Sequence, residues 1–250
     1  SGSGGHGAAG AQRAGEGGGH RRALYVVKKP VFRPVGEHGL LVEFGDEISA
    51  DIHARVLALD RLLNAAPFAG FREAVPAYAA LLIRFDPLVT DHGIVHRAVE
   101  ALLHTPVSPQ APSALREVAI CYDEDFAPDL AAVARHGGMT PEQVIAAHLA
   151  GEYRVFMYGF APGYAYLAGV PEALRMPRKA TAVRGIAAGS VVIAGPQCLV
   201  TTLTMPTGWW IIGRSPTSIL TGDPAAPFLF DVGDRVRFRR ASRSEYENMK

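Results

Sequence analysis

The sequence predicts two folded domains, an α+β domain at the N-terminus and a mainly-β domain at the C-terminus that forms a closed or nearly closed barrel. Two helical patterns within residues 51–103 are each accompanied by strand patterns. Beyond residue 153, short strand-like runs alternate with Gly/Pro turns and helical periodicity largely ends. A chain of 250 residues that is 48% hydrophobic is long enough to bury a core in each domain.

The N-terminal elements are predicted in the order ββαββα. The strands are expected over 32–35, 40–44, 71–75 and 79–85, and the helices over 51–64 and 91–103. Each helix has one apolar stripe, which in the second helix is Ile94, Val95, Ala98, Val99 and Leu102. Because a single stripe needs one sheet face to cover, these elements predict a small α+β sandwich.

The C-terminal domain is predicted to begin with a strand over 115–122 and a short helix over 129–136. Thr140 precedes Pro141 and stands three residues before Gln143, a pattern typical of a capping box at the start of a second helix. Later strands are expected over 191–194, 199–204, 210–212 and 235–239. Short strands separated by turns predict a barrel.

The domain limits follow from changes in composition. Nine of the first twenty residues are glycine, so 1–22 is expected to be a disordered tail that includes His6 and His20. The first domain is placed at 23–107, the linker at 108–114 where prolines interrupt both periodicities, and the barrel domain at 115–240. Residues 241–250 are expected to be a C-terminal tail.

Composition and absent motifs exclude several classes of protein. A formal charge of +1, from 25 basic and 24 acidic side chains, argues against nucleic acid or an anionic membrane as a partner. No apolar stretch is long enough to cross a bilayer, and two cysteines cannot form a disulfide framework, so we expect a soluble cytoplasmic protein. The sequence lacks P-loop, zincin and C-x-x-C motifs, and no metal site is expected.

The most distinctive segment is residues 159–167, where glycine and proline alternate with three aromatic rings. Gly163 and its neighbours indicate a pre-shaped loop. Tyr164 and Tyr166 are two residues apart, so in an extended loop they share one face. They could then line one side of a site for a flat ligand, or pack beneath the loop. Arg178 and Arg184 carry planar forks of donors that suit carboxylate or phosphoryl oxygens. We predict that these groups face a small ligand with carboxylate or phosphoryl oxygens.

Further candidate site residues lie on both sides of these two arginines. Arg214 beside Gly213 is a third candidate cation, and Gly189-Ser190 could direct backbone N–H groups at an anion or simply form a tight turn. His148 lies near the end of the capped helix. It is either a proton-transfer group or a histidine held by the helix C-terminus, and the sequence leaves both interpretations open.

Two other groups of polar residues have simpler explanations. The residues His92, His96, Glu100 and His104 recur at helical spacing, and most point away from the apolar stripe, so they are interpreted as a solvated face. Cys121 and Cys198 lie in apolar strand contexts and are expected to be buried.

The second half of the chain contains an ordered set of motifs, which are His148, Tyr153, Gly159-Phe160-x-Pro162-Gly163-x-x-Tyr166-Leu167, Pro177-Arg178, Arg184, Ala188-Gly189-Ser190-Val191, Ile193-Ala194-Gly195, Pro206-x-Gly208-Trp209 and Ile212-Gly213-Arg214-x-Pro216. This set resembles the KipI/PxpB family, whose members are also known as the B component of 5-oxoprolinase, allophanate hydrolase subunit 1 or the B component of the carboxyltransferase domain. Val183, Ala187 and Thr207 depart from the family pattern, which has proline, proline and glycine there.

The resemblance implies a ferredoxin-like N-terminal domain, a cyclophilin-like barrel and a function as the small subunit of a two-component, amide-directed hydrolase. The implied partner is a homologous larger subunit of the KipA/PxpC type, and the implied cofactor is ATP, bound either at the interface with that partner or by the partner alone. In this interpretation Arg178 and Arg184 stabilise negative charge, His148 transfers a proton, and Tyr164, Tyr166, Gly163, Gly189, Ser190 and Arg214 contact substrate. The resemblance also allows a non-catalytic inhibitor of a sensor histidine kinase, or a carboxyltransferase component of a biotin-dependent, urea-type carboxylase.

Overall fold

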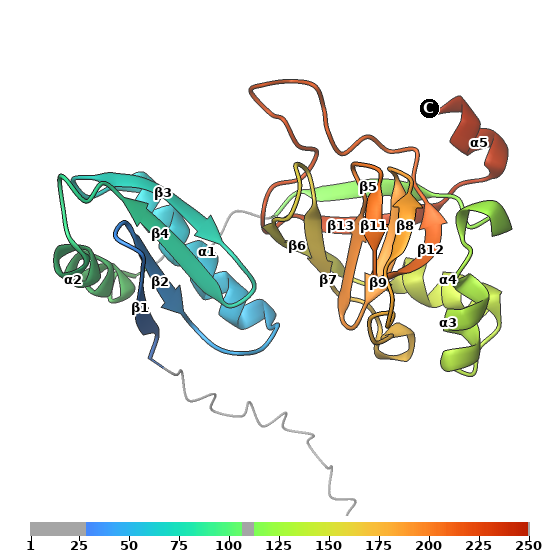
Figure 1. Cartoon of the computed structure of the whole chain (residues 1–250), viewed down its shortest axis with the longest axis horizontal. Coiled ribbons are helices and arrows are strands. Elements are labelled where there is room, and N and C mark those ends of the chain that lie inside the picture. The colour runs from blue at the N-terminus through green and yellow to red at the C-terminus, as the bar shows by residue number, and fades with distance from the viewer. Residues whose placement is uncertain (1–28, 107–112, 250) are drawn as a thin grey trace, which may run out of the picture.

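The computed structural model describes residues 29–106 and 113–249. Within these ranges, each half of the chain has its own sheet and its own hydrophobic core (Figure 1). The predicted Gly-rich tail and most of the predicted linker lie outside the described residues. No helix in the described part of the chain is long and apolar enough to cross a membrane.

The N-terminal half follows the predicted order ββαββα. Its elements are β1 (Val31–Val35), β2 (Gly39–Glu43), α1 (Ala50–Ala65), β3 (Phe71–Pro76), β4 (Ala80–Phe85) and α2 (His92–Leu103). The four strands are antiparallel to their neighbours and are arranged in the order β1-β2-β4-β3. This is the strand order of a ferredoxin-like sandwich in which the last strand of that fold stands first in the chain.

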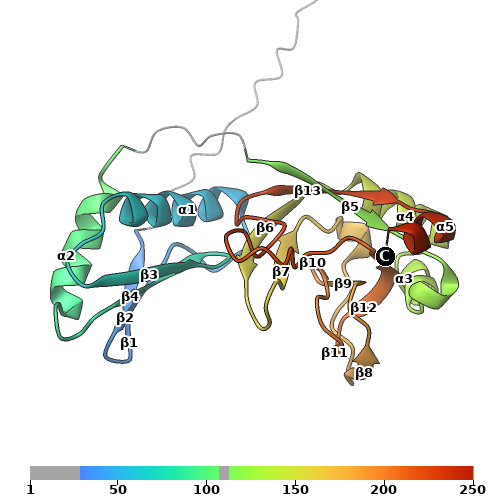
Figure 2. The ribbon, with the colours of Figure 1, turned by 90° about the horizontal axis from the view of Figure 1, so that it is seen from above.

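Both helices pack on one face of this sheet (Figure 2). Side chains of β2 and β4 form the core with Val56, Leu59 and Leu63 of α1, and with Val95 and Val99 of α2. The predicted inward position of Ile94 is wrong, because this side chain is 47% exposed at the edge of the stripe. The rest of the apolar stripe faces the sheet as predicted. The predicted solvated face is only partly solvated, because His92 Nε2–H donates to the Gly39 carbonyl oxygen at 3.0 Å and the His96 ring stacks on Phe32 at 4.0 Å.

The C-terminal half is built around a seven-stranded sheet in the order β12-β9-β10-β7-β6-β13-β5. Its strands are β5 (Leu115–Ile120), β6 (Tyr153–Tyr158), β7 (Ala165–Ala168), β9 (Ser190–Ala194), β10 (Gln197–Val200), β12 (Trp210–Arg214) and β13 (Arg235–Arg240). Cys121, just after β5, and Arg214, at the end of β12, exchange two backbone hydrogen bonds of 2.8 and 2.9 Å. The two edge strands therefore meet, and the predicted barrel closes at this seam.

Two short strands and several helices surround the barrel. Strands β8 (Val183–Ile186) and β11 (Met205–Thr207) form a separate two-stranded sheet. Helices α3 (Leu130–His136) and α4 (Pro141–Ala150) lie where they are predicted, as does the capping box of Thr140 and Gln143. Strand β10 ends at Val200, so the strand predicted over 199–204 is too long at its C-terminal end.

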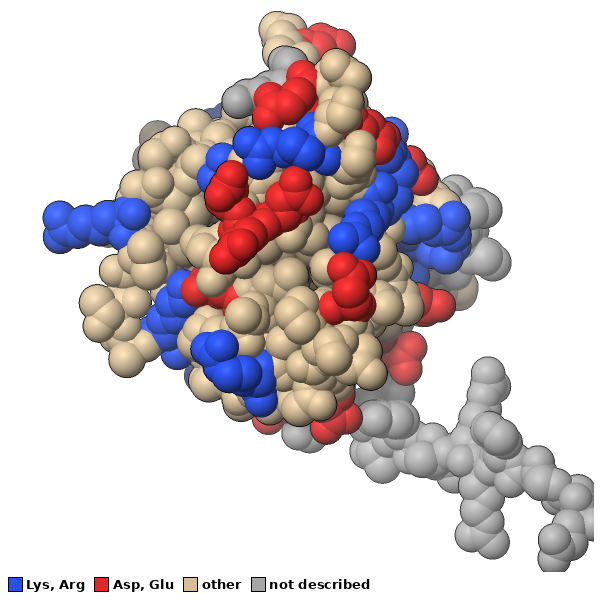
Figure 3. Space-filling model, turned by 90° about the vertical axis from the view of Figure 1, so that its right-hand side faces the viewer, with Lys and Arg blue, Asp and Glu red and all other residues tan. Residues whose placement is uncertain are grey.

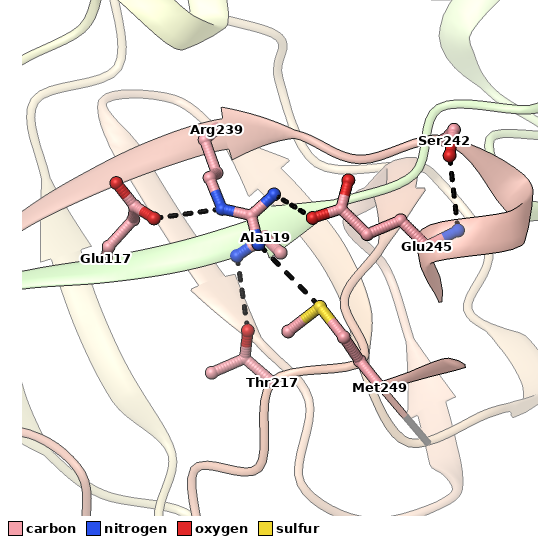
Figure 4. Close-up of polar contacts among 7 residues, drawn as sticks. All are labelled: Glu117, Ala119, Thr217, Arg239, Ser242, Glu245 and Met249. Atoms are coloured by element: carbon pink, nitrogen blue, oxygen red, sulfur yellow. Dashed lines mark hydrogen bonds and ion pairs between the residues drawn. The ribbon is translucent and has the colours of Figure 1, made fainter. Parts of the chain in front are cut away.

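Residues 241–249 are more ordered than the predicted tail over 241–250. Helix α5 (Arg243–Asn248) begins at the cap Ser242, and Tyr246 is buried against Phe126. Arg239 of β13 connects this helix to the barrel, because its guanidinium bonds both Glu117 of β5 and Glu245 of α5 (Figure 4).

The two halves meet at Phe156 of β6. His53 of α1 is buried, and its Nε2–H donates a hydrogen bond of 2.8 Å to the Phe156 carbonyl oxygen. The His53 ring also stacks on the Phe156 ring at 4.2 Å, and Tyr78 lies 5.4 Å from the same ring. Burial at this junction lowers the pKa of His53 to about 4. His53 is therefore a neutral donor that holds the two halves together.

Candidate functional site

The loop predicted as a rim lies between β6 and β7 and is locally strained. Phe160 has a φ of 72° and, among the described residues, is the one non-glycine residue with positive φ. Its ring is 75% exposed and stands 5.7 Å from the ring of Tyr164. An exposed aromatic ring held in a left-handed conformation is unfavourable for the isolated chain, because the Cβ crowds the backbone at this φ.

Below this loop, Tyr166 of β7 and two aromatic residues that directly precede β7 and β12 form one face of the barrel, here called the aromatic face. Tyr164 is buried, and Tyr166 of β7 makes an edge contact with Trp209 at 5.9 Å. These rings pack in a cluster with aliphatic side chains of β8, β9, β10 and β12. Burial raises the pKa of Tyr164 to about 12, so its hydroxyl stays protonated at neutral pH. The structure therefore brings the two predicted tyrosines together and adds Trp209 to them.

Arg178 lies at the edge of this aromatic face. The segment around it is fixed by hydrogen bonds from Lys179 N to the Gly208 carbonyl (2.7 Å) and from Trp210 Nε1 to the Pro177 carbonyl (2.6 Å). A Cβ on Gly208 would lie 3.9 Å from Arg178 Nε, so the guanidinium passes close to this glycine. Burial raises the pKa of Tyr166, and the charge of Arg178 acts in the opposite direction.

The Arg178 guanidinium has no hydrogen-bond or ion-pair partner within the described ranges. The residue is exposed, so its free donors can contact an anionic or carbonyl oxygen at the edge of the aromatic face. Arg184 is exposed on β8, in the small sheet where Val183 pairs with Thr207 of β11. The two arginines thus belong to neighbouring segments, and Arg178 is the one that contacts the aromatic face.

A hollow rich in hydroxyl groups, here called the hydroxyl hollow, lies beside the rim loop. Its volume is about 250 Å³, and its lining includes Thr201, Thr202, Ser215, Thr217, Ser218 and Leu220. Gly163 has a φ of 73°, and a Cβ there would lie 2.8 Å from Leu220 Cδ2. Glycine at this position therefore allows the rim loop to approach the wall of the hollow.

Gly189 also lines the hydroxyl hollow, but its backbone does not offer the predicted anion nest. Gly189 N donates to the Thr201 carbonyl (2.6 Å) and Ser190 N donates to Thr201 Oγ1 (2.9 Å), so neither N–H is free. The buried Ser190 hydroxyl donates to the Ala187 carbonyl. A Cβ on Gly189 would lie 2.5 Å from the Ser215 carbonyl oxygen, which accounts for a glycine here. The alternative interpretation, a tight turn, describes this segment.

Arg214 points away from the aromatic face. Its guanidinium lies 4.8 Å from the centre of the Phe126 ring, and Arg243 of α5 stacks at 4.1 Å on the same ring. This cation–π contact places Arg214 in the packing between the barrel and α5. The structure does not bring Arg214 together with Arg178.

His148 lies in the barrel core and is fully buried. Its Nδ1 is 2.8 Å from the Tyr122 hydroxyl, its Nε2 is 3.7 Å from Cys198 Sγ, and its ring stacks on Phe238 at 4.7 Å. Burial lowers the pKa of His148 to about 3, so the ring is neutral in the folded protein. This position favours a packing function over the predicted proton transfer, because a histidine closed off from solvent cannot exchange its proton with a substrate at the surface.

The described residues contain no group of three or more His, Cys, Asp or Glu side chains arranged to hold a metal ion. On the face that carries α3 and α5, basic and acidic side chains alternate without forming a region of one sign (Figure 3). Several of them form ion pairs there, such as Arg240 with Glu142 and Arg243 with Glu247. This face has no broad positive field of the kind that binds nucleic acid.

The sequence alone does not predict that the hydroxyl side chains of the hydroxyl hollow lie together. Thr201 and Thr202 follow β10 and Ser215 follows β12, so only the fold brings these two segments together. Trp209 is part of a recognisable Gly-Trp-Trp run, yet its contact with Tyr166 depends on how β7 and β12 are placed.

Comparison with known proteins identifies relatives along most of the chain. The family model for the carboxyltransferase domain, subdomain C and D, matches residues 30–230. The 5-oxoprolinase B subunit of Bacillus subtilis (strain 168) is 35% identical over 227 residues, which are 86% of this chain and 95% of that relative. The 5-oxoprolinase B subunit of Escherichia coli O157:H7 is 44% identical over 124 residues, 49% of this chain and 56% of that relative.

Solved structures show the same fold. The crystal structure of TTHA0988 matches with a TM-score of 0.72 and 36% identity over 82% of this chain, which spans 40% of that longer chain. The conserved protein PH0987 from Pyrococcus horikoshii matches over its full length and 86% of this chain, with a TM-score of 0.51 and 32% identity. The Kluyveromyces lactis urea carboxylase has a TM-score of 0.71 at 17% identity over 88% of this chain and 22% of its own, which is a likeness of fold alone.

Proposed function

The chain belongs to the carboxyltransferase domain family, subdomain C and D, and from this membership we propose that it is the B subunit of a 5-oxoprolinase. The relative from Bacillus subtilis carries that name, and the alignment covers 95% of its length. Such a name implies at least one further subunit, so the chain acts as one component of a hydrolytic enzyme. The larger partner is of the KipA/PxpC type.

The observation that supports a substrate site is the placement of Arg178 beside Tyr166 and Trp209 without an acidic partner in the described ranges. Opening of a cyclic amide places negative charge on the amide oxygen as the carbonyl carbon is attacked. The backbone on both sides of the exposed Arg178 is held by hydrogen bonds, which keeps its guanidinium near the aromatic face, where it can donate to the developing oxyanion. Arg178 is therefore assigned to the amide oxygen, and the Tyr166 and Trp209 rings are assigned to the flat ring of the substrate.

In this proposal the larger subunit binds at the rim loop. The support is Phe160, which presents an exposed ring in a strained backbone conformation. Docking of the larger subunit there would cover Phe160 and enclose the aromatic face. ATP, which activates the amide oxygen for hydrolysis, is assigned to the assembled enzyme. No residue of this chain is assigned to it.

The test is co-expression of the chain with its larger partner and measurement of ATP-dependent glutamate release from 5-oxoproline. Arg178→Ala is expected to lower kcat/KM by roughly 100-fold, the usual cost of losing one stabilising donor. Arg97→Ala, which removes an exposed arginine of α2, is the matched control and should retain full activity. Absence of ATP-dependent turnover in the assembled wild-type protein, or less than about tenfold loss in Arg178→Ala, would contradict the proposal.

A further inference from the structure

A separate cavity of about 300 Å³ lies where the two halves of the chain meet. It is lined by Ile48, Ala50, Glu152, Tyr153, Arg154, Phe156, Ala168, Gly169, Arg175, Pro196 and Arg235. Ile48 precedes α1 and Ala50 is its first residue, and the others belong to the barrel domain. The cavity shares no residue with the aromatic face or with the hydroxyl hollow.

Three of the lining residues are arginines, and two of these stand directly opposite each other. Arg154 of β6 and Arg235 of β13 are paired across the antiparallel ladder. Side chains paired in this way leave the same face of a sheet and lie close together, and like charges in such a pair are destabilising. The fold therefore brings two positive charges together at the wall of a cavity.

No carboxylate of the described residues lies within ion-pair distance of Arg154, Arg175 or Arg235. Arg175 Nε donates to the Val170 carbonyl at 3.1 Å, which leaves its other N–H groups available. Two other arginines of β13 are neutralised, because Arg239 pairs with Glu117 and Glu245, and Arg240 pairs with Glu142. Arg235 and Arg237 of β13 have no such pair among the described residues, and of these two only Arg235 lines the cavity and stands opposite another arginine.

We propose that this cavity binds a phosphate group, either free phosphate or the phosphate of a small ester or nucleotide. The three arginines and Glu152 give the lining a net charge of +2. A phosphate monoester carries about −1.5 to −2 at neutral pH and has three acceptor oxygens that match guanidinium forks. Such a ligand would neutralise the opposed Arg154 and Arg235 and satisfy their donors.

A ligand here would also connect the two halves of the chain. The walls combine the start of α1 with β6 and β13, and Arg154 lies near enough to His53 that its charge contributes to lowering the pKa of that histidine. The bound phosphate would therefore stabilise the junction at which His53 donates to Phe156. This function is independent of the substrate site proposed above.

The test measures binding of inorganic phosphate, ADP and adenosine to the whole chain by titration calorimetry. Thermal unfolding with each compound, at constant ionic strength, gives the change in stability. Wild-type protein is expected to bind phosphate and to unfold at a higher temperature in its presence than in chloride. Arg235→Ala and Arg154→Ala should each weaken phosphate binding by at least about tenfold, since a hydrogen bond to a charged group is lost. Arg97→Ala, on the exposed surface of α2, should bind like the wild type.

The stability of the variants without phosphate gives a second measurement. Arg235→Ala should unfold at the same or a higher temperature than the wild type, because it removes one of two opposed like charges. Equal affinity for phosphate and ADP would identify the phosphate group alone as the ligand, and tighter binding of ADP would identify a nucleotide. Binding of neither, or equal binding by Arg235→Ala and Arg97→Ala, would overturn the proposal.

Discussion

Cys121 and Arg214 close the barrel by exchanging backbone hydrogen bonds, although they are far apart in the sequence. They lie at the ends of β5 and β12, which are the two edges of the seven-stranded sheet. The side chain of Arg214 then continues outward to the ring of Phe126. One residue therefore joins the sheet edges with its backbone and anchors a peripheral cluster with its guanidinium.

Gly213 controls how closely this seam can close. A Cβ at Gly213 would lie 2.7 Å from Ile120 Cγ2 and 3.0 Å from the Cys121 carbonyl oxygen. Gly213→Ala is therefore expected to lower the free energy of unfolding by about 1–3 kcal/mol, as overpacking usually does. Urea unfolding measures the effect. Gly208→Ala is the control, because the nearest atoms to its Cβ are in ordinary contact at 3.8 Å, and an equal loss in both variants would refute the seam explanation.

The strain at Phe160 leads to a prediction in which stability and binding change in opposite directions. Phe160→Gly should keep or raise the free energy of unfolding by up to about 1 kcal/mol, because glycine adopts a φ of 72° without the cost of a Cβ. Phe160→Ala keeps that cost. Both variants lose the exposed ring, and we expect each to bind the larger subunit at least about tenfold more weakly in calorimetry. Unchanged binding in both would remove the rim loop from the interface.

Local patterns in the sequence predict much of the fold. The capping box at Thr140 and Gln143 involves neighbours only three residues apart, and it forms as predicted. The apolar period of α2 correctly places Val95 and Val99 inside, but it cannot say that Ile94 falls beyond the edge of the sheet. Strand β6 ends just before the aromatic loop and β7 begins within the Gly/Pro/aromatic pattern, so this pattern does not reveal where the two strands end and begin.

The site is predicted less completely, because it depends on contacts between distant segments. Arg178 and Arg214 look alike in the sequence, since Arg178 follows a proline and Arg214 follows a glycine, both near the aromatic motifs. The structure separates them: Arg178 lies by Gly208 and Tyr166, whereas Arg214 stacks on Phe126. The opposed pair of Arg154 and Arg235 has no sequence signature at all, because it depends on the register between β6 and β13.

Two buried histidines should make stability depend on acid pH. Burial lowers the pKa of His53 to about 4 and that of His148 to about 3, both below the ordinary value of 6.5. As pH falls below 6.5 the unfolded chain binds protons first, so the free energy of unfolding decreases, and this loss continues until the folded pKa is reached. Between pH 7 and 5 each histidine should contribute about 2 kcal/mol of this loss.

Urea unfolding at pH 7 and pH 5 measures this dependence. His53→Gln keeps a donor for the Phe156 carbonyl and should reduce the pH-dependent loss by about half. His136→Gln, at the exposed end of α3, is the control and should leave the loss as in the wild type. Equal pH dependence in His53→Gln and the wild type would show that His53 is not the titrating group.

The position of His148 predicts that stability and catalysis can be separated at this residue. Tyr122→Phe removes the hydroxyl that bonds His148 Nδ1 and leaves that buried nitrogen unsatisfied, which should cost about 1–3 kcal/mol of unfolding free energy. Because the His148 ring is enclosed by Tyr122, Cys198 and Phe238, the folded variant should keep its kcat and the pH profile of kcat in the assembled enzyme. If His148 instead transfers a proton to substrate, the same variant would shift the acid limb of that profile. Steady-state kinetics across pH, performed where the variant is fully folded by circular dichroism, distinguishes the two outcomes.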